Sequence, residues 1–195
     1  EVLLTSRSSQ APVSWSADGR FLVFQVREGG RSDLWALPMN GKRTPFPILQ
    51  TPADEIGGRI SPDGRWITYY SDEPRPWSVF VERFSPGGRP VQQESGQRQR
   101  VHVAEGVEPR WGRNGRELFF ISSQELMVAT IDTGEWFGVR SIRKLFSVGR
   151  YFHRGFGYTV SPDGQRFLFS APVADAPVSS PTATVVVNWA AKLAR

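Results

Sequence analysis

The chain has 195 residues with a hydrophobic fraction of 39% and no cysteine, which predicts a packed core and excludes disulfides and thiolate metal sites. Its formal net charge of +5 is dominated by arginine and is spread along the chain, so we expect a mildly basic surface and no nucleic-acid partner.

Membrane contact by this segment is not expected, because no stretch approaches the roughly 18 apolar residues that a spanning helix needs. The missing cysteines leave the compartment open, and a periplasmic or extracytoplasmic location is compatible with them. The chain starts at Glu1 rather than at a methionine, which suggests a mature or excised fragment.

One short motif recurs four times. It occupies residues 16–20 (SADGR), 61–65 (SPDGR), 112–116 (GRNGR) and 161–165 (SPDGQ), and its glycines stand 45 to 51 residues apart. A four-stranded propeller blade takes about 40–50 residues. The spacing therefore predicts an all-β propeller with four four-stranded blades.

Each copy of the motif has the chemistry of a tight turn. Proline presets φ, aspartate bonds the local backbone, and glycine takes positive φ without strain. We assign this structural role to Asp18, Gly19, Asp63, Gly64, Asn114, Gly115, Asp163 and Gly164. Catalytic or calcium-binding roles for the aspartates are disfavoured, and Asn114 suits a turn better than a required carboxylate.

Apolar residues flank each motif with a period of two. The third and fifth residues after the glycines are Leu22 and Phe24, Ile67 and Tyr69, Leu118 and Phe120, and Phe167 and Phe169. This alternation indicates a strand with one dominant buried face. The residues four before the glycines are also apolar, and we expect Trp15 and Trp111 among them to be buried between blades.

In chain order, we predict strands at 12–16, 20–27, 33–38 and 45–50, at 58–61, 65–71, 77–84 and 100–104, at 108–112, 117–122, 125–131 and 140–146, and at 157–161, 166–170 and 182–189. Residues 85–99 and 171–181 have the composition of loops. Residues 190–195 could form at most one helical turn.

The blades span about 6–51, 57–104, 107–147 and 156–195, within a single domain covering 1–195. The last blade lacks a fourth strand, and residues 1–5 (EVLLT) are the candidate. Pairing an N-terminal strand into the last blade would remove an exposed edge.

The motif resembles that of the TolB-type, WD-repeat-like propeller family. The resemblance rests on residues 15–19, 60–64 and 160–164, and on the third-strand patterns at 33–37 and 78–81. It covers most of the chain and implies the fold rather than a specific activity. The third copy departs from the pattern, because it lacks the serine and the proline and has Asn114 in place of aspartate.

The C-terminal strands, from residues 167–169 through 185–189, look similar to the end of certain bacterial Ser/Thr kinases and regulators, in which a propeller follows a signalling domain. That resemblance implies a place in a longer sensor protein. The kinase motifs themselves are absent from this sequence.

Family members usually have six or more blades, so three arrangements are open. The chain could be part of a larger propeller, a four-bladed ring, or half of an eight-bladed ring completed by a two-fold dimer. An open array would leave apolar blade faces in water, so closure or association is expected.

Candidate ligand-binding residues lie at one register of the first strand of each blade. Five residues before the glycines stand Ser14, Arg59, Arg110 and Thr159. The two arginines could bind one anionic ligand, or each could pair with a nearby acid such as Glu55 or Glu108. The second candidate cluster comprises Arg150, Tyr151, His153, Arg154 and Tyr158, before the last blade.

Catalytic signals are scarce. His102 and His153 are the only histidines, and neither has a second ligand at metal spacing. No phosphate-binding or dinucleotide motif occurs, so no cofactor is expected. Trp77 and Trp136 lie beside turns and, if exposed, could anchor a protein partner.

Three functional hypotheses follow. The favoured one is a non-catalytic scaffold or sensor that binds a protein or a small anionic ligand. The second is a propeller hydrolase or lactonase with a metal in the channel. The third is a self-assembling half-propeller with a structural role only.

Overall fold

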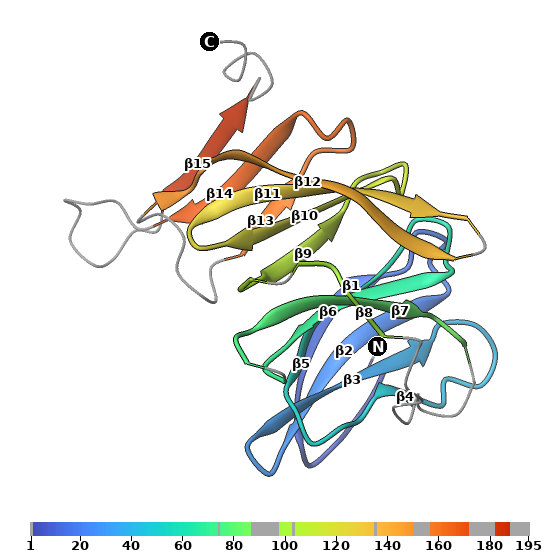
Figure 1. Ribbon diagram of the computed structural model, residues 1–195. Helices are drawn as coiled ribbons and strands as arrows, with labels where there is room; N and C mark the ends of the chain where they lie inside the picture. The colour runs from blue at the N-terminus through green and yellow to red at the C-terminus, as the bar shows by residue number, and fades with distance from the viewer. Residues whose placement is uncertain are drawn as a thin grey trace. The chain divides into compact units, whose positions relative to one another are not determined.

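The computed structural model of the chain describes residues 2–73, 75–86, 98–102, 104–134, 136–149, 157–171 and 182–187. In these ranges fifteen strands form four antiparallel sheets (Figure 1). Strands that are neighbours in sequence are hydrogen-bonded neighbours in each sheet, as expected for chains that double back at tight turns. The predicted all-β, propeller-type architecture is confirmed.

The first sheet contains β1 (Ser9–Trp15), β2 (Phe21–Glu28), β3 (Arg31–Pro38) and β4 (Phe46–Leu49). The second contains β5 (Glu55–Ile60), β6 (Trp66–Ser71), β7 (Ser78–Arg83) and β8 (Gln99–Arg100). The third contains β9 (Val107–Trp111), β10 (Glu117–Ser122), β11 (Glu125–Thr133) and β12 (Phe137–Ser147). The fourth contains β13 (Tyr158–Val160), β14 (Arg166–Ala171) and β15 (Thr182–Val187).

Every predicted strand has a counterpart whose ends differ by at most four residues. The fourth sheet has three strands within the described residues, and residues 2–5 are not in a strand. Their pairing with the last sheet, the closure of a ring and the single domain over 1–195 stay predictions. Most of the predicted loops at 85–99 and 171–181, and the helical turn at 190–195, lie outside the described residues.

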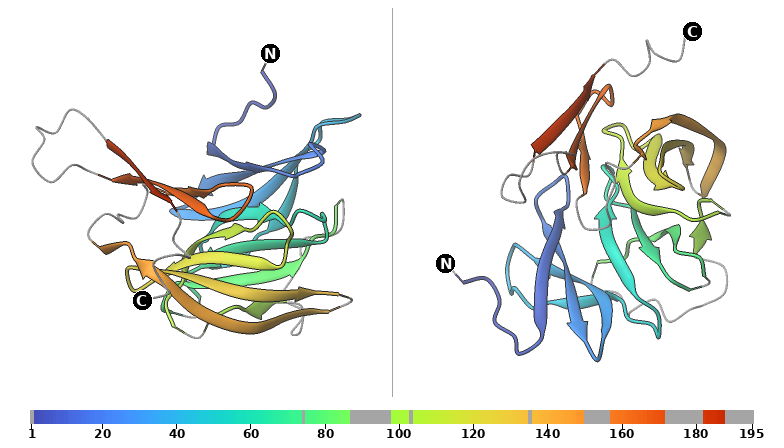
Figure 2. Two further views of the ribbon diagram at one scale, coloured as in Figure 1. Left: turned by 90° about the horizontal axis from the view of Figure 1, so that it is seen from above. Right: turned by 90° about the vertical axis from the view of Figure 1, so that its left-hand side faces the viewer.

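The chain divides into two compact units, Glu1–Pro109 and Arg110–Arg195, with the boundary inside β9. The core of the first unit lies between its two sheets. The strands of both sheets are twisted (Figure 2). Its apolar members include Val23 and Leu34 from the first sheet and Ile60, Ile67 and Tyr69 from the second. The first unit is therefore two sheets packed face to face around one core.

Gly58 of β5 lies at the closest approach between these two sheets. A Cβ at this position would lie 2.8 Å from Leu34 Cδ1 and 3.2 Å from Val23 Cγ1. The register of β5 against β6 shifts between Ile56 and Arg59, so Gly57 and Gly58 form a β-bulge. A Cβ here would require the buried side chains of Leu34 and Val23 to shift, which favours glycine at this position.

In the second unit, aromatic rings join the third sheet to the fourth. Phe119 of β10 contacts Phe167 of β14 edge to face, with ring centroids 5.2 Å apart. Phe146 of β12 contacts both Phe167 and Phe169, at 5.7 and 6.2 Å. Such edge-to-face pairs add to the stability that apolar burial provides.

The prediction of one dominant buried face for the strand after each motif holds in the fourth copy, where Leu168 is 39% exposed between the buried Phe167 and Phe169, but it was wrong in the other three. Phe24, Tyr69, Phe120 and Phe169 are buried, but so are residues on the opposite face: Val23, Thr68 and Phe119 are all 0% exposed. The polar Thr68 concealed this second face in the sequence; it is buried with its hydroxyl donating to the Phe80 carbonyl at 2.9 Å.

Candidate functional site

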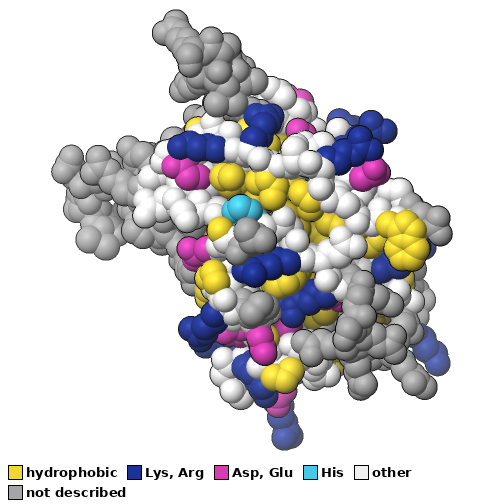
Figure 3. Space-filling model, in the orientation of Figure 1, with side chains coloured by type: hydrophobic (Ala, Val, Ile, Leu, Met, Phe, Trp, Pro, Cys, Tyr) yellow, Lys and Arg dark blue, Asp and Glu magenta, His cyan; other side chains and the backbone are white. Residues whose placement is uncertain are grey.

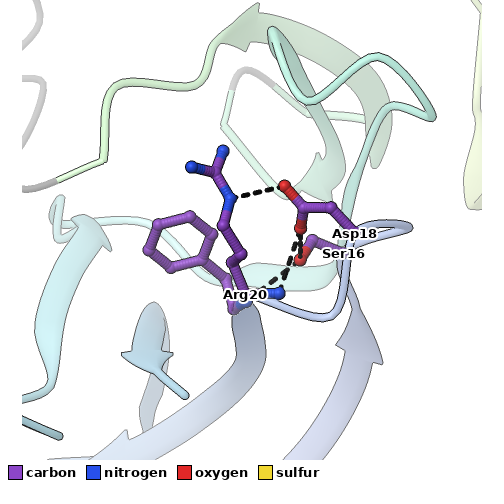
Figure 4. Close-up of polar contacts among 4 residues, drawn as sticks. Ser16, Asp18 and Arg20 are labelled. Carbon is purple, nitrogen blue, oxygen red and sulfur yellow. Dashed lines mark hydrogen bonds and ion pairs between the residues drawn. The ribbon is translucent and has the colours of Figure 1, made fainter. Parts of the chain in front are cut away.

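The first copy of the turn motif forms a closed hydrogen-bond network around Asp18 (Figure 4). The Ser16 hydroxyl donates to Asp18 Oδ1 at 2.6 Å, and the Arg20 backbone N–H donates to the same oxygen at 3.0 Å. Arg20 Nε donates to Asp18 Oδ2 at 2.6 Å. Gly19 has φ of 70°, and its N–H donates to the Ser16 carbonyl at 2.9 Å. The carboxylate is therefore engaged within its own turn.

The serine hydroxyl has a second role that the sequence analysis missed. Ser16 Oγ accepts the Phe21 N–H at 3.0 Å, the first amide of the returning strand. The second and fourth copies repeat this bond, from the Trp66 N–H to Ser61 Oγ and from the Arg166 N–H to Ser161 Oγ, each at 2.9 Å. The sequence did contain a signal for this role, because serine stands at this position in three of the four copies.

The third copy keeps the turn with fewer side-chain bonds. Gly115 has φ of 68°, and the Arg116 N–H donates to Asn114 Oδ1 at 2.9 Å. Gly112 stands where the other copies have serine, so no hydroxyl is present. A Cβ there would lie 3.2 Å from Glu117 Cβ, which is tighter than an ordinary contact. The departure from the motif therefore accompanies a locally crowded backbone.

These bonds change the acidity of the turn carboxylates. The Ser16 hydroxyl, followed by the Arg20 amide and guanidinium, lowers the pKa of Asp18 from 3.8 to about 2. The Ser161 hydroxyl and the Gln165 amide likewise lower the pKa of Asp163. Hydrogen bonds to a carboxylate favour its charged form, so these aspartates stay ionised at neutral pH.

A cavity of about 390 Å³ lies within the second unit, next to the third and fourth turns. Its lining combines the cationic Arg113 and the anionic Glu117 and Asp163 with the uncharged Asn114, Pro162 and Gly164. Across the described residues, no group of three or more His, Cys, Asp or Glu side chains is placed to hold a metal ion. The cavity is thus a pocket with side chains of both charges at its wall.

Of the predicted ligand residues, Arg110 and Tyr158 lie together. Arg110 Nε donates to the Tyr158 carbonyl at 3.0 Å, and its guanidinium carbon lies 5.1 Å from the centre of the Tyr158 ring. Arg59 lies in β5, opposite Thr68, in the other compact unit. Arg150, Tyr151, His153 and Arg154 lie outside the described residues. Anion binding by this set stays a prediction.

The Arg110 bond has a counterpart in the first unit. The Ser14 hydroxyl donates to the Gly58 carbonyl at 2.8 Å. In both bonds the donor lies five residues before a motif glycine, and the acceptor lies six before the next. The same register therefore links the first strand of one sheet to the first strand of the following sheet, and we call this bond the register link. Pairing of Arg110 with an acid such as Glu108 stays a prediction.

A buried polar cluster in the second sheet was not predicted. Glu55 and Glu82 are 1% and 3% exposed, and the Tyr69 hydroxyl donates to Glu82 Oε1. Arg98 stacks over Phe80, with its guanidinium carbon 3.5 Å from the ring centre. Burial raises the pKa of Glu55 from 4.5 to about 7, and it also raises the pKa of Glu82. No motif in the sequence marks this cluster, because its members come from separate strands.

Four tryptophans were given an expected exposure, and Trp15 differs from it. Trp136, in the turn between β11 and β12, is 76% exposed. Trp77 is half-buried against Tyr70, with ring centroids 5.5 Å apart. Trp15 was expected to be buried, but it is 55% exposed, whereas Trp111 is half-buried. The burial of Ile60, at the position equivalent to Trp15, shows that this register can be covered.

On the face that Figure 3 shows, lysine and arginine side chains lie in several separate groups with acidic side chains among them. Within the described ranges, no helix combines the length and the apolarity that a bilayer crossing requires.

Comparison with known proteins identifies the fold. No protein-family model matches the chain, and no curated protein does. Among solved structures, the chain is similar to TolB from Acinetobacter baumannii, with a TM-score of 0.64 and 15% identity over 95% of this chain and 45% of that one. The chain thus spans less than half the length of that TolB.

Two further structures that the chain resembles are described as enzymes. One is a puromycin-hydrolyzing peptidase from Mycobacterium tuberculosis, with a TM-score of 0.53 and 13% identity over 91% of this chain and 30% of that one. The other, from Bacteroides uniformis, is provisionally assigned as a 6-phosphogluconolactonase, with a TM-score of 0.51 and 16% identity over 89% and 55%. Identities this low establish architecture and not activity. The chain is thus a TolB-like β-propeller in its fold.

Proposed function

We propose that the chain is a non-catalytic propeller scaffold that binds a protein partner through the tip of the β11–β12 hairpin. The observation that carries this proposal is Trp136, which is 76% exposed in that turn. A large aromatic side chain left in water gains free energy when a partner covers it, and tryptophan is enriched in the energetic centres of protein interfaces.

The strands beneath Trp136 favour a rigid anchor. Thr133 pairs with Phe137, and Phe137 is only 4% exposed, so the base of the turn is fixed in the sheet. Arg140 Nη2 lies 2.6 Å from Asp132 Oδ2 just below the tip, and Val139 beside it is 36% exposed. An aromatic anchor with an apolar neighbour and a nearby arginine is a typical composition for a protein-binding patch.

The test uses three forms of the chain as bait in an extract of the source organism: wild type, Trp136→Ala and Val2→Ala. Val2 is the control, because this apolar side chain is 75% exposed, like that of Trp136, but lies outside the β11–β12 hairpin. We expect proteins that are enriched by wild type and Val2→Ala and lost with Trp136→Ala. The affinity of the enriched protein should fall at least about tenfold with Trp136→Ala. Equal enrichment and affinity for all three baits would reject the proposal.

The other hypotheses receive less support. Binding of an anion by Arg59 and Arg110 has to account for the use of Arg110 in the register link to Tyr158. The hypothesis of a hydrolase with a metal in the channel rests on a likeness of fold to enzymes. A likeness of fold assigns no site residue to this chain. Both stay predictions for this chain.

A further inference from the structure

Leu168, in the middle strand of the fourth sheet, is exposed where its equivalents are not. It lies four residues after the motif glycine and is 39% exposed. At the same position of the other three copies stand Val23, Thr68 and Phe119, and each is 0% exposed. The repeat thus provides three internal controls, all of which bury this side chain.

Two equivalents of Leu168, Val23 and Phe119, show which way this position of the repeat faces: each lies toward the sheet that follows its own. Val23 belongs to the core that includes Ile67 and Tyr69 of the next sheet, and Phe119 contacts Phe167 of the next sheet. On β14, Phe167 and Phe169 pack against Phe146 of the third sheet. Because side chains alternate along a strand, Leu168 lies on the opposite face. That face is built to receive a further sheet.

The first sheet offers the complementary surface. Ile60 lies four residues before its motif glycine, on the face of β5 where Gly58 meets Leu34 and Val23 of the preceding sheet. Ile60 is 7% exposed, whereas Trp15 at the equivalent position is 55% exposed. The Trp15 side of the first sheet is therefore the type of surface that packs against a preceding sheet.

The register link gives a polar match between the same two surfaces. Its donors are Ser14 and Arg110, and its acceptors are the carbonyls of Gly58 and Tyr158. In the fourth sheet the donor position is Thr159, which is exposed and carries a hydroxyl. In the first sheet the acceptor position is Val13, at the register shift of β1 between Pro12 and Ser14.

We propose that a second copy of this chain packs the Trp15 side of its first sheet on the Leu168 face of the fourth sheet, with Thr159 donating to the partner's Val13 carbonyl. The chain carries both halves of the contact, so the occupant needs no other sequence. Two such contacts related by a two-fold axis would join eight sheets into one assembly.

The first measurement is the mass in solution at tens of micromolar, by light scattering. We expect twice the chain mass of 21.9 kDa for wild type. Leu168→Asp and Trp15→Asp should each be monomeric, because both surfaces occur in every contact of a homodimer. Trp136→Asp, another exposed apolar position, should remain dimeric. Near-ultraviolet circular dichroism checks folding, and Leu168→Ser and Trp15→Ser serve if either aspartate variant is unfolded.

Mixing the two monomeric variants gives the sharper test. Leu168→Asp keeps an intact Trp15 surface, and Trp15→Asp keeps an intact Leu168 surface, so one good contact is restored and a heterodimer should form. A wild-type monomer, a dimer that survives both single substitutions, or a mixture that stays monomeric would overturn the proposal. Because Trp136 is not involved, these outcomes are independent of the partner-binding experiment above.

Discussion

At the scale of the residue, the turn motif works as a hydrogen-bond unit organised by one carboxylate. Asp18 accepts bonds from Ser16 and Arg20, and Ser16 in turn accepts the amide of Phe21. The serine therefore connects the acid to the first residue of the next strand. Removal of the hydroxyl should affect both the charge of the acid and the start of the strand.

The substitution Ser16→Ala tests this connection through the acidity of Asp18. The serine bond is the largest contribution that holds the pKa of Asp18 at about 2, so the pKa should rise toward 3.8 in the variant. An NMR titration of the Asp18 carboxyl carbon measures it. Ser141→Ala, at an exposed serine outside the motif, should leave the value unchanged. An Asp18 pKa that stays near 2 in Ser16→Ala would show that the hydroxyl is not its main determinant.

Sequence reasoning reached some of these residue roles and not others. Glycine at positive φ follows from turn chemistry, because few other residues adopt it. The Arg110 partner was not predictable in the same way, since its acceptor is a backbone carbonyl that any residue at position 158 would supply. The buried Glu55 and Glu82 escaped because an acid inside a strand normally indicates an exposed face.

At the scale of the element, the distance between the first two sheets depends on Gly58. Leu34 and Val23 occupy the space that a Cβ would take, and neither can move without disturbing the core. Interiors this closely packed respond to a single added methyl group.

The substitution Gly58→Ala should therefore destabilise the protein by about 1–3 kcal/mol, the usual cost of overpacking. Gly138→Ala is the control, because that glycine also lies in a strand and an added Cβ would find no atom closer than 3.9 Å. Urea denaturation compares the two variants with wild type. Equal stabilities for Gly58→Ala and Gly138→Ala would mean that the sheets can separate without cost.

The strands themselves were largely predictable, because glycine turns at regular spacing mark where the chain reverses. Strand ends were less so: β8 comprises only Gln99–Arg100, whereas the pattern predicted 100–104. Apolar residues such as Val101 and Val103 suggest a longer strand, but pairing depends on the partner strand β7 and not on local composition. The burial of Thr68 in β6 was hidden for a related reason, since local composition does not show that its hydroxyl donates to the Phe80 carbonyl.

At the scale of the whole molecule, buried acids make the stability depend on pH. Glu55 is neutral in both states below about pH 4.5. Between about pH 4.5 and 7 the unfolded chain loses the proton while the folded protein keeps it, so unfolding becomes easier as the pH rises. The lowered pKa values of Asp18 and Asp163 act in the opposite direction below about pH 4.

We predict that Glu55→Gln gains stability relative to wild type as the pH rises from 4.5 to 8, by up to about 3 kcal/mol, the equivalent of the shift in the pKa of Glu55. Glutamine keeps the size of the side chain and an acceptor for Thr51. Urea unfolding at several pH values measures the difference, and Glu28→Gln, at an exposed glutamate, is the control. A difference between Glu55→Gln and wild type that does not change with pH would contradict the prediction.

The register link has a consequence for how the repeats can diverge. In both register links the acceptor is a main-chain carbonyl, which a substitution cannot remove. Substitutions can change only the donor side chain and the space around the carbonyl. Where the donor is the short Ser14, the acceptor residue is Gly58, which has no Cβ; where the donor is the long Arg110, the acceptor residue is the bulky Tyr158. A short donor side chain is thus paired with a small acceptor residue, and a long donor side chain with a large one. At each junction between repeats, the length of the donor side chain and the volume of the acceptor residue should therefore change together in evolution.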